Sequence, residues 1–367
     1  MRAFILLLGL QISCTAVAEI VSETLLAETF HGAGAHGVLV NSFANRAEIY
    51  DADTGKMKGL LSLGIGHNAV EIDEKNKLFH VAETYFSRHT RGTRSDLVTS
   101  YDFNTLSAVT EVAIPNKHSS GSPIRSYSGL TDDSRFMLIN NFSPAMSVSV
   151  VDLGKAKFVG EIATAGCGLI YPVGNRTFIQ LCGDGKVQLV SLDKNGNEQS
   201  RLRSADFFSV YKDPIMEKAV RTSKGWVFST FSGELFRVTV DGKSITTEHL
   251  FGLAEKAEGW RPGGMQPFAY HESGDLLLAL MHEGGKHTHK DPGSEIWILD
   301  LTGQRLMHRM KLDNMASSIA VSQDESPLIY SVFVGGSTLD VYDLVKAKKI
   351  RSINVGPTPT ILQNLQL

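Results

Sequence analysis

The sequence has little cysteine, no excess of one charge and no long apolar stretch, and each shortage excludes a class of protein. Three cysteines in 367 residues exclude a small disulfide-dense scaffold. The 36 basic and 39 acidic residues leave a net charge of -3, so we expect no nucleic-acid partner. Beyond the first residues, no apolar run approaches the roughly 18 residues that a membrane span needs. We therefore expect no membrane-spanning segment. The composition, 42% hydrophobic and 20% charged, is that of a folded globular protein.

Familiar catalytic motifs are missing as well. There is no GxSxG, no HExxH, no phosphate-binding glycine loop and no CxxC, so no such motif indicates a catalytic residue in this chain, and we expect none. The densest polar cluster spans Met281–Lys290, where His282, Glu283, His287 and His289 are residue types that bind metals. We favour an exposed loop between strands there and predict no metal site.

Residues 1–18 have the pattern of a secretory signal peptide. Arg2 precedes an apolar core from Ala3 to Leu10, and the small residues Ala16–Ala18 form a cleavage site. Its removal would take Cys14 away and leave Cys167 and Cys182. A Pro-Val-Gly-Asn turn lies midway between them, so an antiparallel hairpin would place the two cysteines opposite each other, within disulfide range. We predict a disulfide, with two buried thiols as the alternative.

One pattern recurs along the chain: an apolar strand, an aspartate, a polar turn and another strand. The aspartates of the seven copies are Asp51, Asp102, Asp152, Asp193, Asp241, Asp300 and Asp343. The gaps between them run from 41 to 59 residues, with a mean near 49, as in β-propeller blades. An aspartate at this place sets the turn by accepting hydrogen bonds from backbone N–H groups. Although the length would suggest two domains, we predict an all-β, seven-bladed β-propeller in a single domain, 19–367. We expect the chain to finish on the outer strand of the seventh blade.

Two further loops are rich in residues that anchor protein interfaces. The first, Ser87–Asp96, contains Arg88, Arg91 and Arg94, whose forked guanidinium groups suit carboxylates on a partner. The second, Glu258–Gly264, contains Trp260 and Arg261 on a Gly/Pro turn. The alternatives are a solvated hairpin for the first loop and a plug that packs on the propeller end for the second.

Taken together, these motifs resemble a known family. The segments Ser87–Asp96, Gly259–Gly264, Gly166–Cys167 with Cys182–Gly185, and Thr288–Lys290 with Glu295–Trp297 are similar to the heavy subunit of quinoprotein amine dehydrogenases. The likeness runs from about residue 45 to 350. Of the two branches, the stretches Phe207–Pro214 and Cys182–Gly185 look closer to aromatic amine dehydrogenase than to methylamine dehydrogenase.

The resemblance implies a periplasmic α2β2 complex that oxidises a primary amine to an aldehyde and ammonia. It implies a small subunit that carries tryptophan tryptophylquinone, no cofactor bound by the present chain, and a blue copper protein (azurin- or amicyanin-like) as electron acceptor. The Cys167–Cys182 pair matches the family's disulfide. Arg88, Arg91, Arg94, Trp260, Arg261 and His289 become candidates for the subunit interface.

One loop is expected to influence substrate choice. Leu63–Asn68 aligns with a family loop that places a phenylalanine at the substrate channel, and Ile65 stands in its place. Ile65, Gly66, His67 and Asn68 are therefore substrate-channel candidates, with a simple start of a strand as the alternative. Two other functions stay open: a free-standing propeller that binds a partner, and a lactonase-type hydrolase with a metal held by inward carboxylates.

Overall fold

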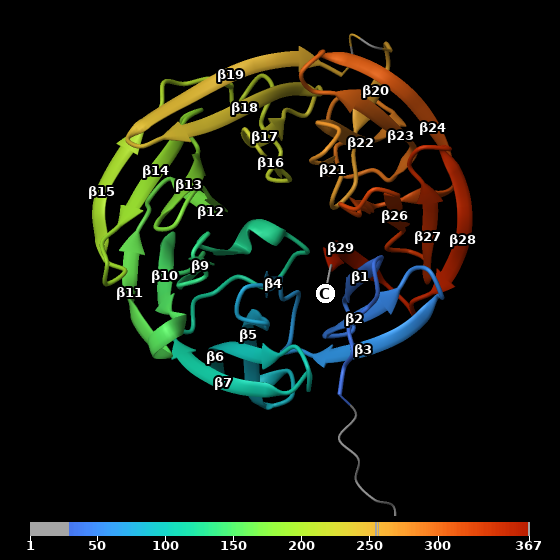
Figure 1. The fold of residues 1–367 in the computed structure, drawn as a ribbon. Coiled ribbons are helices and arrows are strands. Elements are labelled where there is room, and N and C mark those ends of the chain that lie inside the picture. The colour runs from blue at the N-terminus through green and yellow to red at the C-terminus, as the bar shows by residue number, and fades with distance from the viewer. Residues whose placement is uncertain (1–28, 254, 256, 366–367) are drawn as a thin grey trace, which may run out of the picture.

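The computed structural model describes residues 29–253, 255 and 257–365, so the predicted signal peptide at 1–18 lies outside the described residues. Seven β-sheets stand side by side around a central axis (Figure 1). The helices in the described ranges are two 3-10 turns, η1 (Arg125–Tyr127) and η2 (Leu153–Lys155). None of the described helices is long and apolar enough to cross a membrane. The predicted all-β, seven-bladed propeller is confirmed.

Each blade is an antiparallel sheet whose successive strands lie one outside the other, from the centre to the rim. Blades one to three are formed by β29 (Pro359–Leu365), β1 (Gly37–Ser42), β2 (Arg46–Asp51) and β3 (Lys56–Ser62); β4 (Val70–Asp73), β5 (Leu78–Arg88), β6 (Arg91–Asp102) and β7 (Ala108–Ile114); and β8 (Ser128–Leu130), β9 (Phe136–Asn141), β10 (Ser147–Asp152) and β11 (Lys157–Ala163).

Blades four to seven continue the pattern around the ring. They are formed by β12 (Cys167–Pro172), β13 (Thr177–Cys182), β14 (Val187–Leu192) and β15 (Glu198–Arg203); β16 (Val220–Thr222), β17 (Gly225–Ser229), β18 (Glu234–Asp241) and β19 (Ser244–Gly252); β20 (Trp260–Pro262), β21 (Phe268–His271), β22 (Leu276–Glu283), β23 (Gly293–Asp300) and β24 (Arg305–Ala316); and β25 (Ser318–Val321), β26 (Leu328–Val332), β27 (Thr338–Asp343) and β28 (Lys348–Asn354).

The ring closes through the last strand, which corrects one expectation. The chain was predicted to finish on the outer strand of blade seven, but that strand is β28 and is followed by another. Gly356 and Thr358 both have positive φ, and the chain turns there toward the centre. It then forms β29, which pairs with β1 as the innermost strand of blade one (Figure 1). Strands from both ends of the described chain thus share one sheet.

The repeated aspartates occupy equivalent places in the seven blades. Each ends or directly follows the third strand, where the chain turns into the outer strand. In six of the seven turns the carboxylate accepts a hydrogen bond from a backbone N–H group of the turn. The exception is Asp241, for which no such bond occurs among the described residues. The repeat read from the sequence is therefore the blade itself.

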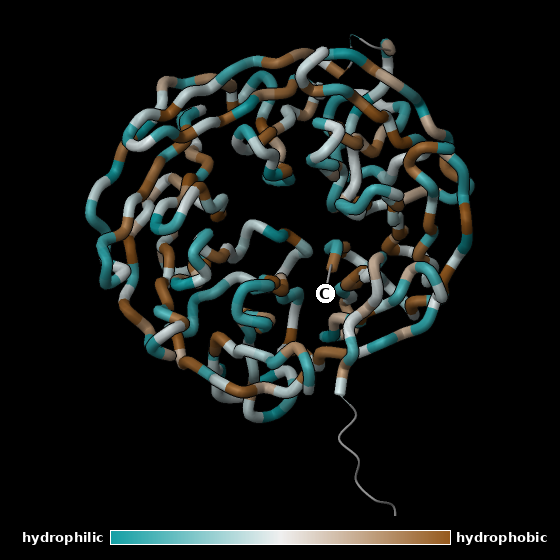
Figure 2. Tube along the Cα trace, in the orientation of Figure 1, coloured by the Kyte–Doolittle hydropathy of each residue, from teal (hydrophilic) through white to brown (hydrophobic). Residues whose placement is uncertain are grey.

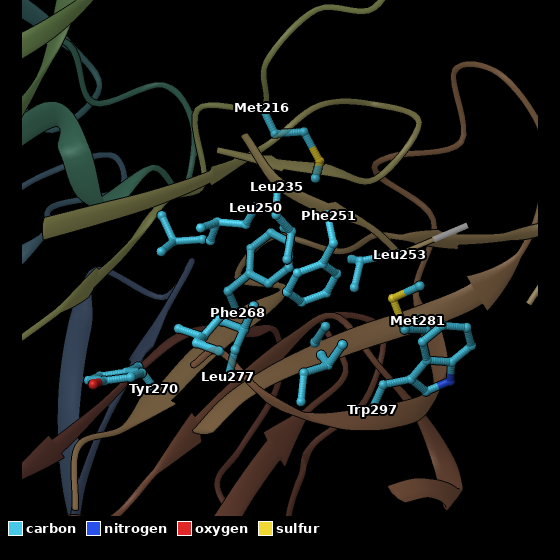
Figure 3. Packing of buried hydrophobic residues seen from close by; sticks show 14 residues of the cluster. Met216, Leu235, Leu250, Phe251, Leu253, Phe268, Tyr270, Leu277, Met281 and Trp297 are labelled. Atoms are coloured by element: carbon cyan, nitrogen blue, oxygen red, sulfur yellow. The ribbon is translucent and has the colours of Figure 1, made fainter. Parts of the chain in front are cut away.

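The core lies mostly between neighbouring blades. Figure 3 shows one such cluster, which joins Phe251 of blade five with Phe268, Leu277 and Trp297 of blade six. Burying one side chain of this size contributes about 1.5–3 kcal/mol. Figure 2 shows hydrophobic stretches along the strands and hydrophilic ones at many turns. The blades therefore stabilise one another.

The predicted disulfide is confirmed. Cys167 and Cys182 lie opposite each other at the ends of β12 and β13, and their sulfur atoms are bonded. A register shift between Gly168 and Tyr171 places one extra residue on β12, an irregularity that the sequence did not predict. The bond holds the hairpin at its open end.

Candidate functional site

The strand order assigns every connection to one of two ends of the propeller. Because the strands of a blade are antiparallel, the turn between its second and third strands lies at the same end as the link to the next blade. We call this the crossover end, and the opposite end, which holds the aspartate turns, the Asp-turn end. All the sequence-predicted site residues lie at the crossover end, as does the disulfide.

The substrate-channel candidates lie in the link from β3 to β4, residues 63–69. The backbone N–H of Ile65 donates to Thr84 O at 2.8 Å, and that of His67 donates to Ser120 O at 2.7 Å. Gly66 has φ +99°, and a Cβ there would be 2.6 Å from Ser120 O, so the loop needs glycine at this place. Ile65 itself remains partly exposed. The loop is thus held in place while Ile65 stays accessible.

His67 ties this loop to the closing strand. Its Nε2 is 2.8 Å from Thr360 Oγ1 in β29, and the Thr360 hydroxyl donates to Asn41 O in β1. Since that hydroxyl proton is used, His67 donates from Nε2 and its tautomer is fixed. Burial lowers the pKa of His67 to about 4, so the ring is neutral near pH 7. Asn68 completes the contacts, donating from Nδ2 to Gly64 O at 2.7 Å.

A buried carboxylate, that of Glu83, holds the same loop through hydrogen bonds. Glu83 is fully buried and accepts hydrogen bonds from the Gly64 N–H at 2.8 Å and from the Tyr101 hydroxyl at 3.1 Å. Burial raises the pKa of Glu83, and the hydrogen bonds from its neighbours oppose that rise. Burial and the nearby Glu83 charge together raise the pKa of Tyr101. No signal in the sequence marks this polar support, because Glu83 lies within a mostly apolar strand and its partners come from other segments.

The arginine-rich loop is a two-stranded arm. The pairing of β6 with β7 begins only at Asp96, so residues 85–95 project beyond the sheet. Arg88 and Arg91 pair with each other near its tip and are exposed, and neither side chain has a hydrogen-bond or ion-pair partner among the described residues. Arg94 lies at the base, where it donates two hydrogen bonds to Asp96, each at 2.7 Å. We call residues 85–95 the arginine arm; Arg94 anchors it and the other two arginines extend from it.

The second interface loop packs against blade six. Trp260 lies on Trp297, with ring centroids 5.6 Å apart, and the Arg309 guanidinium lies 4.5 Å from the centroid of Trp260. Arg261 donates from Nη1 to Trp260 O at 2.8 Å. Trp260 and Arg261 both stay partly exposed. The plug and the interface interpretations are therefore compatible here, since the loop packs on the blade and still presents surface.

The histidine cluster of Met281–Lys290 is divided among several contacts. His282 Nε2 is 2.8 Å from Thr288 Oγ1, while the His289 ring stacks on Phe231 with centroids 3.6 Å apart. Burial, followed by the charge of Lys218, lowers the pKa of His289. His287 meets Phe231 edge-on. Within the part of the chain that the structure describes, no three His, Cys, Asp or Glu side chains form a group suited to a metal.

Aromatic side chains missed by the sequence analysis also gather at the crossover end. The exposed phenylalanines and tyrosines of the described residues all lie there: Phe43, Tyr85, Phe142 and Tyr211. They sit in or beside loops, where a single aromatic residue gives no periodic signal. Exposed aromatic residues are enriched in protein interfaces. The crossover end is therefore the face best suited to a protein partner.

A central cavity of about 330 Å³ runs along the inner strands. Its charged lining residues are Glu71, Arg125, Glu217, Lys218 and Arg221. Glu71 accepts a hydrogen bond from Ser128 Oγ at 2.7 Å, and burial lowers the pKa of Lys218. Two carboxylates beside three basic groups do not form the inward acidic ring that the lactonase-type alternative needs.

Comparison with solved structures identifies the fold. A periplasmic gluconolactonase from Pseudomonas aeruginosa superimposes with a TM-score of 0.61 at 14% sequence identity, covering 90% of this chain and 99% of that one. A dihydro-heme d1 dehydrogenase superimposes with a TM-score of 0.56 at 13% identity, covering 90% of this chain and 75% of the other. At such low identity these likenesses concern the propeller alone.

Comparison with protein sequences is more specific. The methylamine dehydrogenase heavy chain of Methylorubrum extorquens is 30% identical over 333 residues, which are 87% of this chain and 80% of that protein. The heavy chain of Methylophilus methylotrophus is 28% identical over 318 residues, 85% of this chain and 78% of its own length. The expected preference for the aromatic branch has no support, because these relatives are of the methylamine type. A sequence model of the methylamine dehydrogenase heavy chain matches residues 38–366, and the chain belongs to that family.

Proposed function

We propose that this chain is the heavy subunit of a periplasmic dehydrogenase that oxidises primary amines. The observation that carries the proposal is the family match over residues 38–366. The partner would be a small subunit that carries tryptophan tryptophylquinone, in an α2β2 complex, and electrons would leave to a blue copper protein. Export to the periplasm would follow from the signal peptide predicted at 1–18.

The crossover end is the proposed docking face for the small subunit. It combines the exposed aromatic residues with the arginine arm, whose Arg88 and Arg91 are free of described partners. Trp260 and Arg261 add partly exposed surface on blade six. Aromatic and arginine side chains at the centre of an interface contribute most of its binding free energy. His289 would act indirectly, since its ring holds the β22–β23 loop against Phe231.

The tryptophans of this chain do not fit the quinone cofactor. Trp297 is fully buried and its indole N–H donates to Glu295 Oε2 at 2.8 Å. Trp260 packs on Trp297, and the Arg309 guanidinium lies over both rings. The indole N–H of Trp226 donates to Pro172 O at 2.8 Å. All three are engaged in packing within or between blades, which supports placing the cofactor in the small subunit.

The 63–69 loop is the part of this chain proposed to border the substrate channel. Its fixed backbone would present Ile65 toward the partner, where the side chain would exclude water and limit the size of the entering amine. His67, Asn68 and Glu83 would position the loop through the hydrogen bonds described above. One extra or missing methylene group in an apolar pocket changes specificity by about 1–3 kcal/mol, which sets the scale expected for Ile65.

Purification of the assembled protein tests the proposal. The chain carrying a C-terminal affinity tag is expressed from its native genome, and the proteins that bind it are identified by mass spectrometry. A small protein with covalently bound quinone, detected by redox-cycling stain, is expected. A chain that purifies alone, without quinone staining, would contradict the proposal and favour a free-standing propeller.

A further inference from the structure

The outer strands of three neighbouring blades carry an excess of positive charge that has no role in the account so far. They are β24 of blade six, β28 of blade seven and β3 of blade one, which follow one another along the outside of the ring (Figure 1). Together they contain eight lysine and arginine residues and one acidic residue, Asp313. The outer strands of the other four blades, β7, β11, β15 and β19, contain three basic and four acidic residues. We call β24, β28 and β3 the basic rim.

Four lysines of the basic rim are free to bind a partner. Lys56, Lys58, Lys311 and Lys348 are exposed, and their ammonium groups have no hydrogen-bond or ion-pair partner among the described residues. Unpaired lysines gathered on one side of a molecule attract an anionic surface, and added salt screens that attraction. The basic rim is therefore suited to a partner with many negative charges.

Exposed apolar side chains gather on the same strands. Among the described residues, eight large aliphatic or methionine side chains are exposed, and five of them belong to the basic rim: Met57, Leu60, Met307, Met315 and Ile350. A sixth, Val345, lies in the turn that leads into β28. This second asymmetry is independent of the charge. The basic rim thus combines free ammonium groups with hydrocarbon that no other part of the chain covers.

A cavity of about 480 Å³ lies within the basic rim, between blades six and seven. Lys311 of β24 and Lys348 of β28 belong to its lining, so ammonium groups come from both blades. Asp313 also lines the cavity, but its carboxylate lies 3.6 Å from Lys349 Nζ, which compensates its charge. Lysines from two blades around one hollow suit a phosphate group, which accepts charge-assisted hydrogen bonds.

The residue types favour a lipid surface over a protein as the partner. Lysine is depleted and aromatic residues are enriched at protein interfaces. The exposed phenylalanines and tyrosines of the described residues lie at the crossover end, outside the basic rim. Membrane surfaces, in contrast, are bound through lysines that meet headgroup phosphates and through apolar side chains that enter the headgroup region.

We propose that the basic rim docks the protein edge-on to a membrane that contains anionic phospholipid. The lysine ammonium groups donate hydrogen bonds to headgroup phosphates, and the methionine, leucine and isoleucine side chains enter the headgroup region. Since the outer strands form the side of the ring, a membrane bound there leaves the crossover end open (Figure 1). This surface is therefore additional to the proposed function and compatible with it.

Sedimentation of the purified full chain with lipid vesicles tests this surface. At low salt the chain should bind vesicles of equal parts phosphatidylcholine and phosphatidylglycerol, and added sodium chloride should weaken the binding. Binding to vesicles of phosphatidylcholine alone should be at least about tenfold weaker. The variant Lys56→Gln/Lys58→Gln/Lys311→Gln/Lys348→Gln should bind the anionic vesicles at least about tenfold more weakly than wild type. It loses no described hydrogen bond or ion pair, so its melting temperature should match that of wild type.

The matched control is the variant Lys157→Gln/Lys194→Gln/Lys212→Gln/Lys243→Gln. It removes the same charge from four exposed lysines outside the basic rim and should bind like wild type. All three proteins share residues 1–18, so differences between them report the lysines alone.

The proposal is overturned if the full chain does not bind the anionic vesicles, or if the two variants bind them equally. Capture of the chain by immobilised poly-L-glutamate without vesicle binding would assign the basic rim to an acidic protein, and this result overturns the proposal as well. The measurement uses the chain alone, so its failure leaves the proposed quinone-bearing partner untouched.

Discussion

Among single side chains, Ile65 makes the most direct prediction about specificity. Replacing it by phenylalanine adds an aromatic ring to a partly exposed position on a loop that is otherwise fixed. We expect kcat/KM for bulky arylalkylamines to fall about tenfold relative to methylamine, through a narrower channel. Steady-state rates of the assembled enzyme with both amines measure this ratio. An unchanged ratio would show that Ile65 does not line the substrate channel.

His36 makes a prediction about pH. Its ring bridges Asp53 of blade one at 2.8 Å and Asp324 of blade seven at 2.9 Å. Burial alone would lower the pKa of His36, but the hydrogen bonds and charges of the two aspartates outweigh it, and the net pKa is raised. The stabilisation is therefore complete below about pH 6.5, the ordinary value, and is lost as the pH rises through the folded-state pKa.

The variant His36→Gln should accordingly lower the melting temperature by about 2 °C at pH 5.5 and by less at pH 8.5. Thermal unfolding at several pH values measures this difference. The matched control is His308→Gln, since His308 is exposed and has no described side-chain partner. A deficit that stays constant with pH would show that the protonated ring does not bridge the blades.

Among the strands and hairpins, the disulfide-linked pair β12–β13 gives a stability prediction. The bond between Cys167 and Cys182 closes a loop with a sequence separation of 15 residues. In the chain-entropy account, removing it costs about 3 kcal/mol of the free energy of unfolding. Denaturant titration of the double variant Cys167→Ser/Cys182→Ser should show this loss. An unchanged midpoint would mean that strand pairing alone fixes the hairpin.

The arginine arm predicts an effect on assembly without an effect on stability. Because the side chains of Arg88 and Arg91 form no hydrogen bond or ion pair with described residues, the double variant Arg88→Glu/Arg91→Glu should keep the melting temperature of wild type. Its affinity for the small subunit should fall at least tenfold, measured by surface plasmon resonance at low salt. The control Arg176→Glu changes an exposed arginine at the Asp-turn end and should assemble normally. If both variants bind the small subunit with the same affinity, the arginine arm is not part of the subunit interface.

The same elements show what the sequence predicts and what it does not. The aspartate turns repeat with each blade, so their number and spacing predict the propeller, and the position of the turn predicts the disulfide. The partners of individual side chains are harder to predict from the sequence, because they depend on residues far apart in the chain. Arg94 has the same local pattern as Arg88 and Arg91, yet Asp96 and His118 O hold it at the base of the arm. The polar support of the 63–69 loop by Thr360 likewise joins residues from opposite ends of the sequence.

For the molecule as a whole, closure of the ring is the feature on which the other contacts depend. Leu362 of β29 is fully buried among residues of blades one and seven. Its replacement by alanine should lower the free energy of unfolding by about 2–5 kcal/mol, as large-to-small changes in a core do. Equilibrium denaturation measures the loss. Replacement of Val345, an exposed residue on the rim, by alanine is the control and should have little effect.

Ring closure also explains why one end was misjudged from the sequence. The pattern of the last repeat ends with an outer strand, and nothing local marks the following residues as the innermost strand of the first blade. Only the pairing of β29 with β1 supplies blade one with its fourth strand. The closing strand then carries Thr360, the partner of His67, so the structure of the candidate channel loop depends on the closure of the propeller.

The central claim is that this chain works as the heavy subunit of an amine dehydrogenase. The most direct measurement is amine-dependent dye reduction by the complex purified through this chain, compared with the chain alone. We expect the complex to reduce the dye with a primary amine and to release one aldehyde per two electrons transferred. The chain alone is expected to be inactive. A complex with no amine-dependent reduction, or a chain that is fully active by itself, would contradict it.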